Sequence, residues 1–411
     1  MSGLMLWSAL AWRNVWRNRR RSLLTLAIVA VACCAILLAY GFILASFEGL
    51  KFSIVQGGAG HVQLAHRNEF LEQENKPLEY GLSSAQRASL QREAQALGGV
   101  KKILPRLYFQ GLISNGEITR SFSGEGLDAE AEWQAFGKQL RIVSGDYLEG
   151  GDDKRYSIVL GQQLAQRLHA KPGDTLTLVT AAVSGQMNAM DVTLAGVISS
   201  GIAARDTYYL AMPLGGAQEL LRSEKVSRLT VLLQQDLSAA QAQRMQAALP
   251  AGFAQRSWRE LNPIYDQLVT LYRGQFIVLG GILLAVAFLA ILNAIIMNVM
   301  ERTREIGSLR ALGIDAARIR AGFALESFYL CALGSAAGAA LAWGGGWLCR
   351  HIHIMMPAPP GSTSGYPLQL LWDGGMALQV SLALIALGML AAWLASRHVA
   401  SLDILDAINT H

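Results

Sequence analysis

The stretch of the chain most able to contact a partner through its charges is Glu301-Arg-Thr-Arg-Glu-Ile-Gly-Ser-Leu-Arg-Ala-Leu-Gly313. Its composition favours a short helix, and helix-borne arginines can pair with acidic groups of another protein while apolar side chains enter a groove. We expect two sets of contact residues here. The first set is charged: Glu301, Arg302, Arg304, Glu305 and Arg310. The second is apolar, Ile306 and Leu309.

Glu326 is the next candidate, because it is a carboxylate inside an apolar run. An ionisable residue in lipid is costly and often functional. Its position near the end of the run favours pairing with Arg320 over proton transfer. Gly334 and Gly338 lie four residues apart in the same run, and such spacing lets two helices approach closely. We expect them to pack helices within the chain, with a dimer interface as the alternative.

His351, His353, Met355 and Met356 carry the donor atoms of a copper site. The competing interpretation is an interfacial segment whose histidines meet lipid headgroups. A third clear ligand is lacking, so we predict no metal.

Enzymatic motifs are absent from the sequence. It contains no nucleophile elbow, zincin motif or dinucleotide fingerprint, and no lysine is followed by Ser or Thr, as a phosphate-binding loop requires. The chain therefore carries no predicted catalytic residue and no cofactor. If ATP and Mg are used, we expect another polypeptide to bind them.

Four apolar runs must position these residues. The chain is 52% hydrophobic and 16% charged, whereas soluble domains carry about 25% charged residues. Each run reaches the ~20 residues that span a bilayer as a helix. The runs are Ser22 to Ser46, Phe276 to Val299, Gly322 to Leu348 and Met376 to Ser396.

Arginines predict the orientation. They cluster before the first run and between the second and third, which places both termini and the Glu301 segment in the cytoplasm by the positive-inside rule. The net charge of +5 then reflects topology, and no nucleic-acid partner is expected. The predicted divisions are a cytoplasmic amphipathic helix 1–21, spans 22–46, 276–300, 321–349 and 376–396, an outer domain 47–275, a cytoplasmic helix 301–320, an outer loop 350–375 and a cytoplasmic tail 397–411.

The outer domain has mixed helix and strand signals. Val62 to Ala65, Ser84 to Leu97 and Val100 to Leu107 read as strand, helix and strand, and Ser227 to Leu233, Ser238 to Leu249 and Gly252 to Trp258 repeat the pattern. We expect an α+β domain, entered through a flexible connector at Gly57 to His61. A stalk helix, Leu261 to Arg273, leads from it into the second span.

These motifs resemble those of the FtsX-like, MacB-type ABC transporter permeases, a group that includes LolC and LolE. The opening Leu10-Ala-Trp-Arg-Asn-Val-Trp-Arg-Asn-Arg-Arg-Arg-Ser-Leu-Leu-Thr25 is similar to the family's start, and Glu301 to Gly313 is similar to its signature ERxxEIGxLRALG. Glu326, Gly334 and Gly338 match its third span, and Ser401-Leu-Asp-Ile-Leu-Asp-Ala407 resembles its tail. Ile158 to Ala165 and Lys171 to Thr175 resemble its periplasmic core, on the LolC/LolE side.

The resemblance implies an inner-membrane permease that works as a dimer, of identical chains or of two paralogues, with a separate ATPase subunit. The segment after the second span would be the ATPase-coupling helix, and its movement would pass through the spans to the periplasmic domain. The cargo would be a lipoprotein or lipid released from the membrane, with a lipoprotein carrier as a further partner. Two alternatives stay open: MacB-like efflux of peptides or drugs, and FtsX-like signalling to a cell-wall hydrolase.

Overall fold

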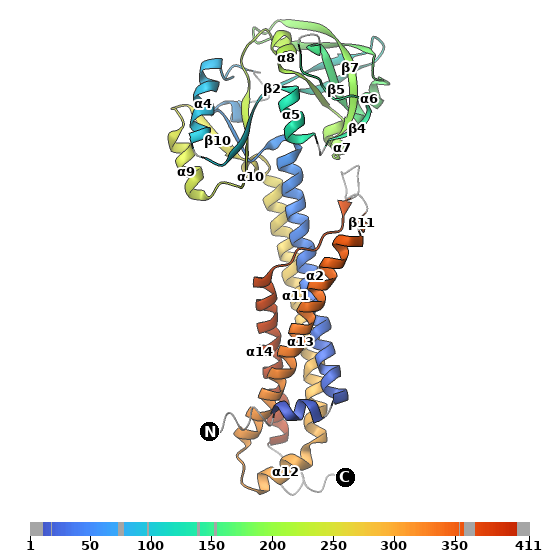
Figure 1. Cartoon of the computed structure of the whole chain (residues 1–411), viewed down its shortest axis with the longest axis vertical. Coiled ribbons are helices and arrows are strands. Elements are labelled where there is room, and N and C mark those ends of the chain that lie inside the picture. Colours follow the sequence, from blue (N-terminus) through green and yellow to red (C-terminus); the bar gives the residue numbers. More distant parts are fainter. Residues whose placement is uncertain are drawn as a thin grey trace. The chain divides into compact units, whose positions relative to one another are not determined.

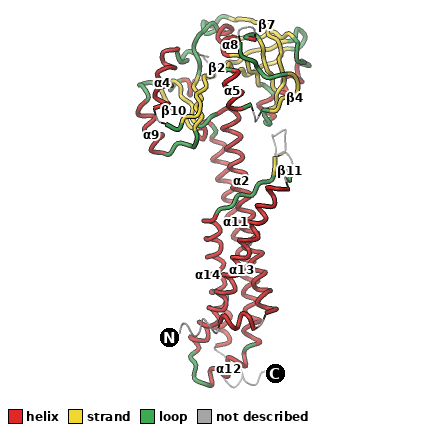
Figure 2. Tube along the Cα trace, in the orientation of Figure 1, coloured by secondary structure: helices red, strands yellow, loops and turns green. Residues whose placement is uncertain are grey.

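The computed structural model describes residues 11–17, 19–72, 78–96, 98–137, 140–151, 154–352, 354–356 and 366–400, with the side chains of 71, 72, 309, 366, 367 and 397–400 left aside. Within these, the chain forms a helical unit and a strand-rich unit (Figures 1 and 2). The helical unit comprises Met1–Glu48, Leu268–Met355 and Pro367–His411, and the strand-rich unit comprises Gly49–Gln267 and Met356–Tyr366.

Four long helices dominate the helical unit, and each is long and apolar enough to cross a membrane. They run side by side around a core of Val, Ile, Leu, Ala and Cys side chains (Figure 1). A short helix, α12, joins the second and third of them. The bounds are α2 Arg19–Ile54, α11 Pro263–Glu301, α12 Thr303–Ala311, α13 Ala316–Ile352 and α14 Gly374–Ala400.

These helices extend beyond the apolar runs that predicted them. α2 continues to Ile54, and α11 begins at Pro263, so the predicted stalk and the second span form one helix. Hydropathy reports only the part of a helix that matches hydrocarbon thickness. Proline at the first helical position explains the start of α11, because its missing N–H costs nothing there.

Glycines on α13 set its distance from α2. A Cβ on Gly334 would lie 2.7 Å from Cβ of Val29, and one on Gly338 would lie 2.7 Å from Cβ of Cys33. Without hydrophobic driving force between helices in lipid, this close approach supplies the packing energy. Both glycines therefore face α2 of the same chain.

The strand-rich unit is built on one large mixed sheet of ten strands. The order is β10-β1-β9-β2-β3-β8-β5-β7-β4, with β6 pairing to β2 and β7. The pairs β3–β8 and β5–β7 are parallel, and the other pairs are antiparallel. The strands are β1 Val62–His66, β2 Val100–Ser114, β3 Thr119–Leu127, β4 Arg141–Gly145, β5 Ser157–Gly161, β6 Thr175–Ala181, β7 Met187–Ser199, β8 Tyr209–Pro213, β9 Arg228–Leu233 and β10 Phe253–Ser257. A separate pair joins β11 Met355–Met356 to β12 Tyr366–Pro367.

Short helices cover this sheet. They are α3 Glu69–Glu72, α4 Ser84–Ala96, α5 Ala129–Phe136, α6 Gln162–Leu168, α7 Ala203–Asp206, α8 Leu214–Leu221, α9 Ala239–Ala248 and α10 Trp258–Leu261, with the π-helical turn η1 at Val55–Ala59. The two strand–helix–strand patterns are confirmed as β1–α4–β2 and β9–α9–β10. Their strands alternate in the sheet, because β9 lies between β1 and β2, and β1 lies between β9 and β10. Ser238 caps the N-terminus of α9 and forms a capping box with Gln241.

The chain enters and leaves the sheet on adjacent strands. β1 follows α2 and η1, β10 leads into α10 and α11, and the two strands pair from Val62–Ser257 to His66–Phe253. Ladder hydrogen bonds thus join the segments that continue into the first and second long helices.

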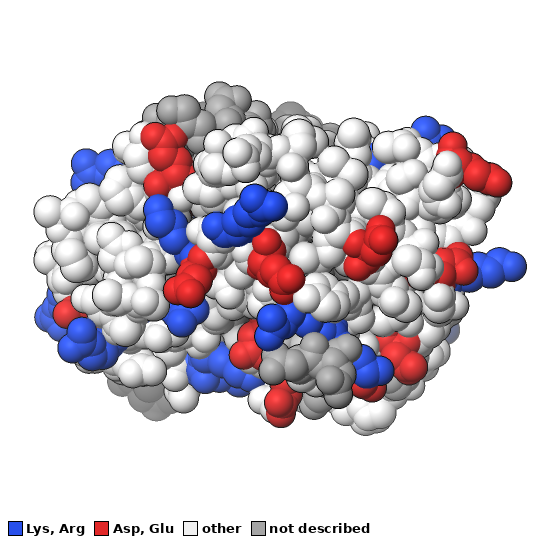
Figure 3. All heavy atoms as spheres, turned by 90° about the horizontal axis from the view of Figure 1, so that it is seen from above, with Lys and Arg blue, Asp and Glu red and all other residues white. Residues whose placement is uncertain are grey.

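On the face of the molecule in Figure 3, basic and acidic side chains are interspersed with wide uncharged areas. Among the described residues on this face, neither sign gathers into one large patch.

Gly338→Ala is expected to destabilise the helical unit by about 1–3 kcal/mol, because the added methyl group must push α13 away from α2. Gly344→Ala is the matched control, since nothing lies within 4 Å of a Cβ at Gly344. Thermal unfolding of both variants in one detergent measures the difference. Equal melting temperatures would contradict the close packing.

Candidate functional site

The charged side chains around α12 form one connected cluster centred on Arg302. This residue lies between the end of α11 at Glu301 and the start of α12 at Thr303, and its side chain is only 16% exposed. Its guanidinium reaches Glu305 Oε2 at 3.0 Å and Glu326 Oε2 at 3.0 Å. It also lies over the ring of Phe323 at 5.2 Å. Arg302 therefore ties α12 to α13.

The buried end of this cluster is Glu326, whose side chain is 8% exposed. Its second carboxylate oxygen accepts a hydrogen bond from Nδ2 of Asn298 on α11 at 3.2 Å. A buried carboxylate is stable only when it is paired and hydrogen-bonded. Here the two partners are Asn298, near the end of α11, and Arg302, just after it. Glu326 therefore fixes the position of α11 and of the turn into α12 against α13.

Two arginines near the N-terminus complete the cluster. Arg17, in the helical residues 11–17, donates to both oxygens of Glu305 at 2.8 and 3.1 Å. Arg21, in the first turn of α2, pairs with Glu301. Trp12 packs edge-on against Tyr329 of α13 with ring centroids 5.4 Å apart. The N-terminal segment thus braces the same end of the helical unit as α12.

Electrostatics keep Glu305 ionised. Partial burial would raise the pKa of its carboxyl, but the hydrogen bonds and charges of Arg302 and Arg17 outweigh burial and lower the pKa. The anion persists at neutral pH, and α12 stays attached to both arginines.

The structure brings only some of the expected contact residues together. Glu301, Arg302 and Glu305 are joined in the cluster, Arg304 is exposed, and Arg310 is half-buried. Ile306 differs from expectation, because it is 4% exposed and belongs to the core of the helical unit. It fixes α12 on its own chain and is not available to a partner's groove. The side chain of Leu309 lies outside the described residues.

Glu326 also pairs with a different arginine from the one expected. The expected Arg320 lies one and a half turns away along α13, whereas Arg302 is supplied by the turn between α11 and α12. Proximity in sequence favoured Arg320, and the folding back of α12 decided otherwise.

Leu312 is the residue of this segment that the sequence did not single out. It is 80% exposed, the highest value for a large hydrophobic side chain among the described residues. Gly313 has φ +83° and ends α12, and its N–H donates to the carbonyl of Arg310. The helix stops so that Leu312 projects beyond it. Leu312 is thus an exposed apolar side chain at the end of a charged helix whose other side packs on its own chain.

A second cluster of buried charge holds η1 in the strand-rich unit. Arg106, on β2, is 3% exposed and makes two 2.7 Å hydrogen bonds to the carboxylate of Glu132 on α5. It donates a third to the carbonyl of Gly58 at 2.7 Å. Arg205 donates to the carbonyl of Gly57 and to Glu125. Two arginines thus hydrogen-bond the backbone carbonyls where the chain passes from α2 to β1.

The flexible connector expected at Gly57 to His61 is therefore wrong. The segment forms the π-helical turn η1, in which Gly58 has φ +117° and a Cβ would strike the Arg106 guanidinium. Glycine is required here for close approach and for a left-handed backbone. The wide backbone freedom of glycine is also the reason why the sequence predicts a flexible connector here.

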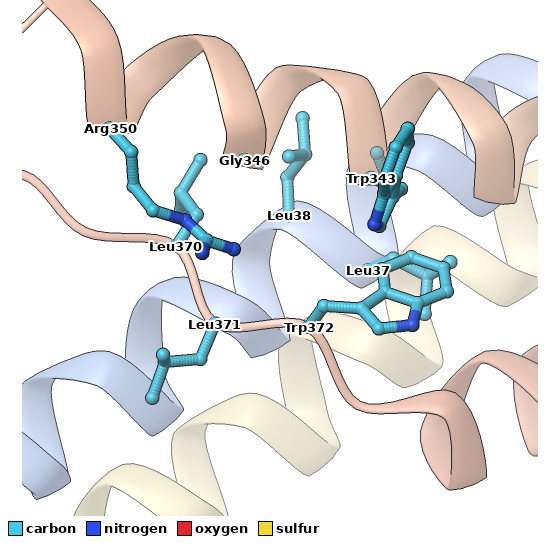
Figure 4. A pocket seen from close by; sticks show the side chains of 9 residues that line it. Leu37, Leu38, Trp343, Gly346, Arg350, Leu370, Leu371 and Trp372 are labelled. Carbon is cyan, nitrogen blue, oxygen red and sulfur yellow. The ribbon is translucent and has the colours of Figure 1, made fainter.

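Two hollows in the described part of the chain differ greatly in size. One notch in the helical unit, between α2, α13 and residues 370–372, has a volume of about 10 Å³ (Figure 4). It is lined by Trp343, Arg350 and Trp372 among others, and it is no larger than one water molecule. A hollow of about 440 Å³ in the strand-rich unit is wide and open, beside Asp128, Arg155 and Pro213.

Metal ligands do not gather among the described residues, where no three His, Cys, Asp or Glu side chains form a group that could hold an ion. His351 lies with Nδ1 2.9 Å from the carbonyl of Trp347 and its ring against the Trp347 ring. Met355 is exposed on β11. His353, which completes the candidate set, lies outside the described residues.

Comparison with known proteins adds two family matches. Residues 22–248 match the MacB-like periplasmic core domain, and residues 277–404 match the FtsX-like permease C-terminal domain. Together the matches include all four long helices and most of the strand-rich unit.

Comparison with individual curated proteins agrees with these family matches. The chain is 24% identical over 252 residues to the lipoprotein-releasing system transmembrane protein LolC of Neisseria meningitidis serogroup B, covering 58% of this chain and 60% of LolC. It is 30% identical over 133 residues to the ABC transporter permease YknZ of Bacillus subtilis, covering 32% and 30%. It is 29% identical over 125 residues to the macrolide export ATP-binding/permease protein MacB of Salmonella paratyphi A, covering 30% and 17%. The matched region thus spans three-fifths or less of each of these relatives.

Among solved structures, the periplasmic region of MacB from Actinobacillus actinomycetemcomitans matches with a TM-score of 0.34 at 13% identity, covering 52% of this chain and 95% of that one. The extracellular domain of the transporter YknZ from Gram-positive bacteria matches with a TM-score of 0.32 at 13% identity, covering 48% and 99%.

Arg302→Met is expected to cost about 3–5 kcal/mol, because it leaves the Glu326 carboxylate buried without its cation. The pair Arg302→Met and Glu326→Met removes both charges and should cost much less than the sum of the single changes. Thermal unfolding of the single and double variants in one detergent closes the cycle. Additive losses would mean that the two side chains do not interact.

Proposed function

This chain belongs to the FtsX/MacB-type family of ABC transporter permeases, and from that premise we propose that it is a permease subunit driven by an ATPase on a separate chain. The ATPase would bind ATP and Mg, and this chain would carry no catalytic residue. A second permease chain would complete the transporter.

One observation carries the proposal: α12 is a rigid lever with an exposed apolar tip. Arg302, Glu305 and Ile306 fix the helix to its own chain, while Leu312 and Arg304 face outward. A coupling helix must be attached to the helices that it moves and must leave a surface exposed to the ATPase. Force applied at Leu312 would pass through Arg302 to α13 and through Glu305 to the N-terminal helix.

The proposed load is the strand-rich unit. α2 and α11 continue into the strand-rich unit, where the Arg106 and Arg205 grip on η1 and the pairing of β1 with β10 join their ends to the sheet. By the positive-inside rule α12 and both termini are cytoplasmic. The strand-rich unit is then the periplasmic domain, in a bacterial inner membrane.

We further propose that the cargo is a lipoprotein or lipid taken from the inner membrane. The support is the match to LolC, a lipoprotein-releasing protein, over 58% of this chain. Macrolide-type efflux is the second candidate, supported by the shorter matches to MacB. Mass spectrometry of lipids and lipoproteins that remain bound to the purified complex separates the two cargo classes.

Leu312→Asp should weaken binding of the partner ATPase at least tenfold and abolish cargo-stimulated ATP hydrolysis, because a carboxylate replaces the apolar tip. The side chain is 80% exposed, so the fold should be unaffected. The measurement is co-purification of the two chains, followed by the ATPase rate with and without cargo.

The matched control is Val183→Asp, an exposed apolar residue in the turn between β6 and β7. It should leave both readouts unchanged. The docking assignment fails if Leu312→Asp and Val183→Asp behave alike.

Glu305→Lys is expected to abolish coupling without preventing membrane insertion, because it places a cation against Arg17 and Arg302 and releases α12. The ATPase would still bind, but hydrolysis would no longer respond to cargo. Adding Arg17→Glu restores one opposite-charge contact and should recover part of the response. Normal cargo stimulation in the single variant would contradict the role of Glu305.

A further inference from the structure

The N-terminal segment of the helical unit carries more basic charge than its own chain neutralises. No acidic residue precedes Glu48, whereas five arginines lie between positions 13 and 21. Arg17 and Arg21 pair with Glu305 and Glu301. The side chains of the other three are exposed and make no hydrogen bond or ion pair within the described part of the chain: Arg13, Arg19 and Arg20.

The helical residues 11–17 run across the direction of the four long helices (Figure 1). Because those helices are the membrane spans, this segment lies along the membrane surface. Side chains four residues apart share a face of a helix, and successive residues lie about 100° apart around it. The segment therefore has a buried face, an aromatic face and a basic face. In order around the helix, these faces are Ala11 with Val15, Trp12 with Trp16, and Arg13 with Arg17.

The aromatic face continues onto α13. Trp16 lies edge-on to Trp12 with ring centroids 6.2 Å apart, and Trp12 lies 5.4 Å from Tyr329. Phe328, which is 39% exposed, extends the row at 5.6 Å from Tyr329. Trp16 and Trp12 are 56% and 41% exposed. Amphipathic rings of this kind are favoured at the headgroup level of a membrane. The row of rings therefore places the adjacent basic face at the level of the lipid phosphates.

The unpaired arginines favour an anion from outside the chain. A guanidinium group offers parallel N–H donors that match the oxygens of a phosphate. The first turn of α2 holds Arg19, Arg20 and Arg21 and no acidic residue, although the positive end of a helix dipole favours an anion there. A zwitterionic headgroup carries its own cation, so it leaves this surplus of positive charge in place. An anionic headgroup neutralises it.

We propose that Arg13, Arg19 and Arg20, beside the face of Trp12 and Trp16, bind anionic phospholipid headgroups of the leaflet at the α12 end of the helical unit. A lipid fits better than a soluble phosphate compound, because the aromatic row needs the edge of the hydrocarbon beside it. This inference goes beyond the proposed function and requires neither the ATPase nor the cargo.

Bound headgroups would also act on α12. Arg17 and Arg21 belong to the same segment as the lipid-binding arginines, and they hold Glu305 and Glu301. Neutralising the unpaired arginines removes repulsion between neighbouring cations of this segment. Anionic lipid would therefore help to keep the segment in the position from which it braces α12.

The test is native mass spectrometry of the full chain in detergent, titrated with phosphatidylglycerol or with phosphatidylcholine, because this measurement resolves individual bound lipids. The unsubstituted chain should bind the first phosphatidylglycerol at least tenfold more tightly than the first phosphatidylcholine. Arg13→Gln combined with Arg20→Gln should weaken phosphatidylglycerol binding by roughly 25-fold, at about fivefold per arginine, the factor that ~1 kcal/mol represents. Binding of phosphatidylcholine should not change.

Two matched variants control for charge and for position. Arg13→Lys combined with Arg20→Lys keeps both charges and should retain most of the preference for phosphatidylglycerol. Arg92→Gln combined with Arg244→Gln removes two exposed arginines from α4 and α9 of the strand-rich unit and should leave lipid binding unchanged.

Equal affinity of the unsubstituted chain for the two lipids overturns the proposal, and this comparison involves no substitution that could disturb folding. Equal losses from the two pairs of Arg→Gln changes overturn the assignment to this face. Displacement of phosphatidylglycerol by inorganic phosphate at the same concentration overturns the lipid as the ligand in favour of a soluble anion. An unchanged lipid preference in the Arg13→Gln and Arg20→Gln variant, together with loss of a co-purifying protein, overturns the lipid in favour of a protein contact.

Discussion

The ion pair between Arg302 and Glu326 is the interaction on which the helical unit depends most. A carboxylate buried among apolar helices is unstable alone, so the chain must bring a cation to it. Arg302 can do this only if the chain turns sharply after α11 and lays α12 against α13. The same guanidinium then holds Glu305, and Glu305 holds Arg17. One electrostatic requirement thereby fixes the turn, the short helix and the N-terminal segment together.

A comparable requirement operates where α2 enters the strand-rich unit. Arg106 and Glu132 are both buried, and a third donor of the guanidinium is satisfied by the carbonyl of Gly58. Because that carbonyl belongs to the chain leaving α2, the need to satisfy a buried arginine also fixes the helix end. In each unit, buried arginine stiffens a junction that loop composition alone would have left loose.

The long helices differ in which of their faces pack within the chain. α13 uses Gly334 and Gly338 to approach α2, which leaves those small residues unavailable to a second molecule. α11 packs one side through Ala287 and Ile291 and leaves the other free. In a bilayer, packing and polar satisfaction select partners because hydrophobicity does not distinguish lipid from protein.

The sequence by itself determined the features that depend on local pattern. Apolar length gave the four long helices, alternation and helix caps gave the strand–helix–strand units, and Glu301 to Gly313 marked the site. Tertiary structure alone decided which of those residues are exposed and which are buried. Ile306 became core and Leu312 became the exposed tip, since only the angle of α12 against α13 determines which face is covered. The pairing of Arg17 with Glu305 joins residues 288 positions apart, and the order of Gly57 and Gly58 comes from arginines on β2 and α7. Such contacts have no local signature, because they arise only when distant segments must satisfy one another's buried charges.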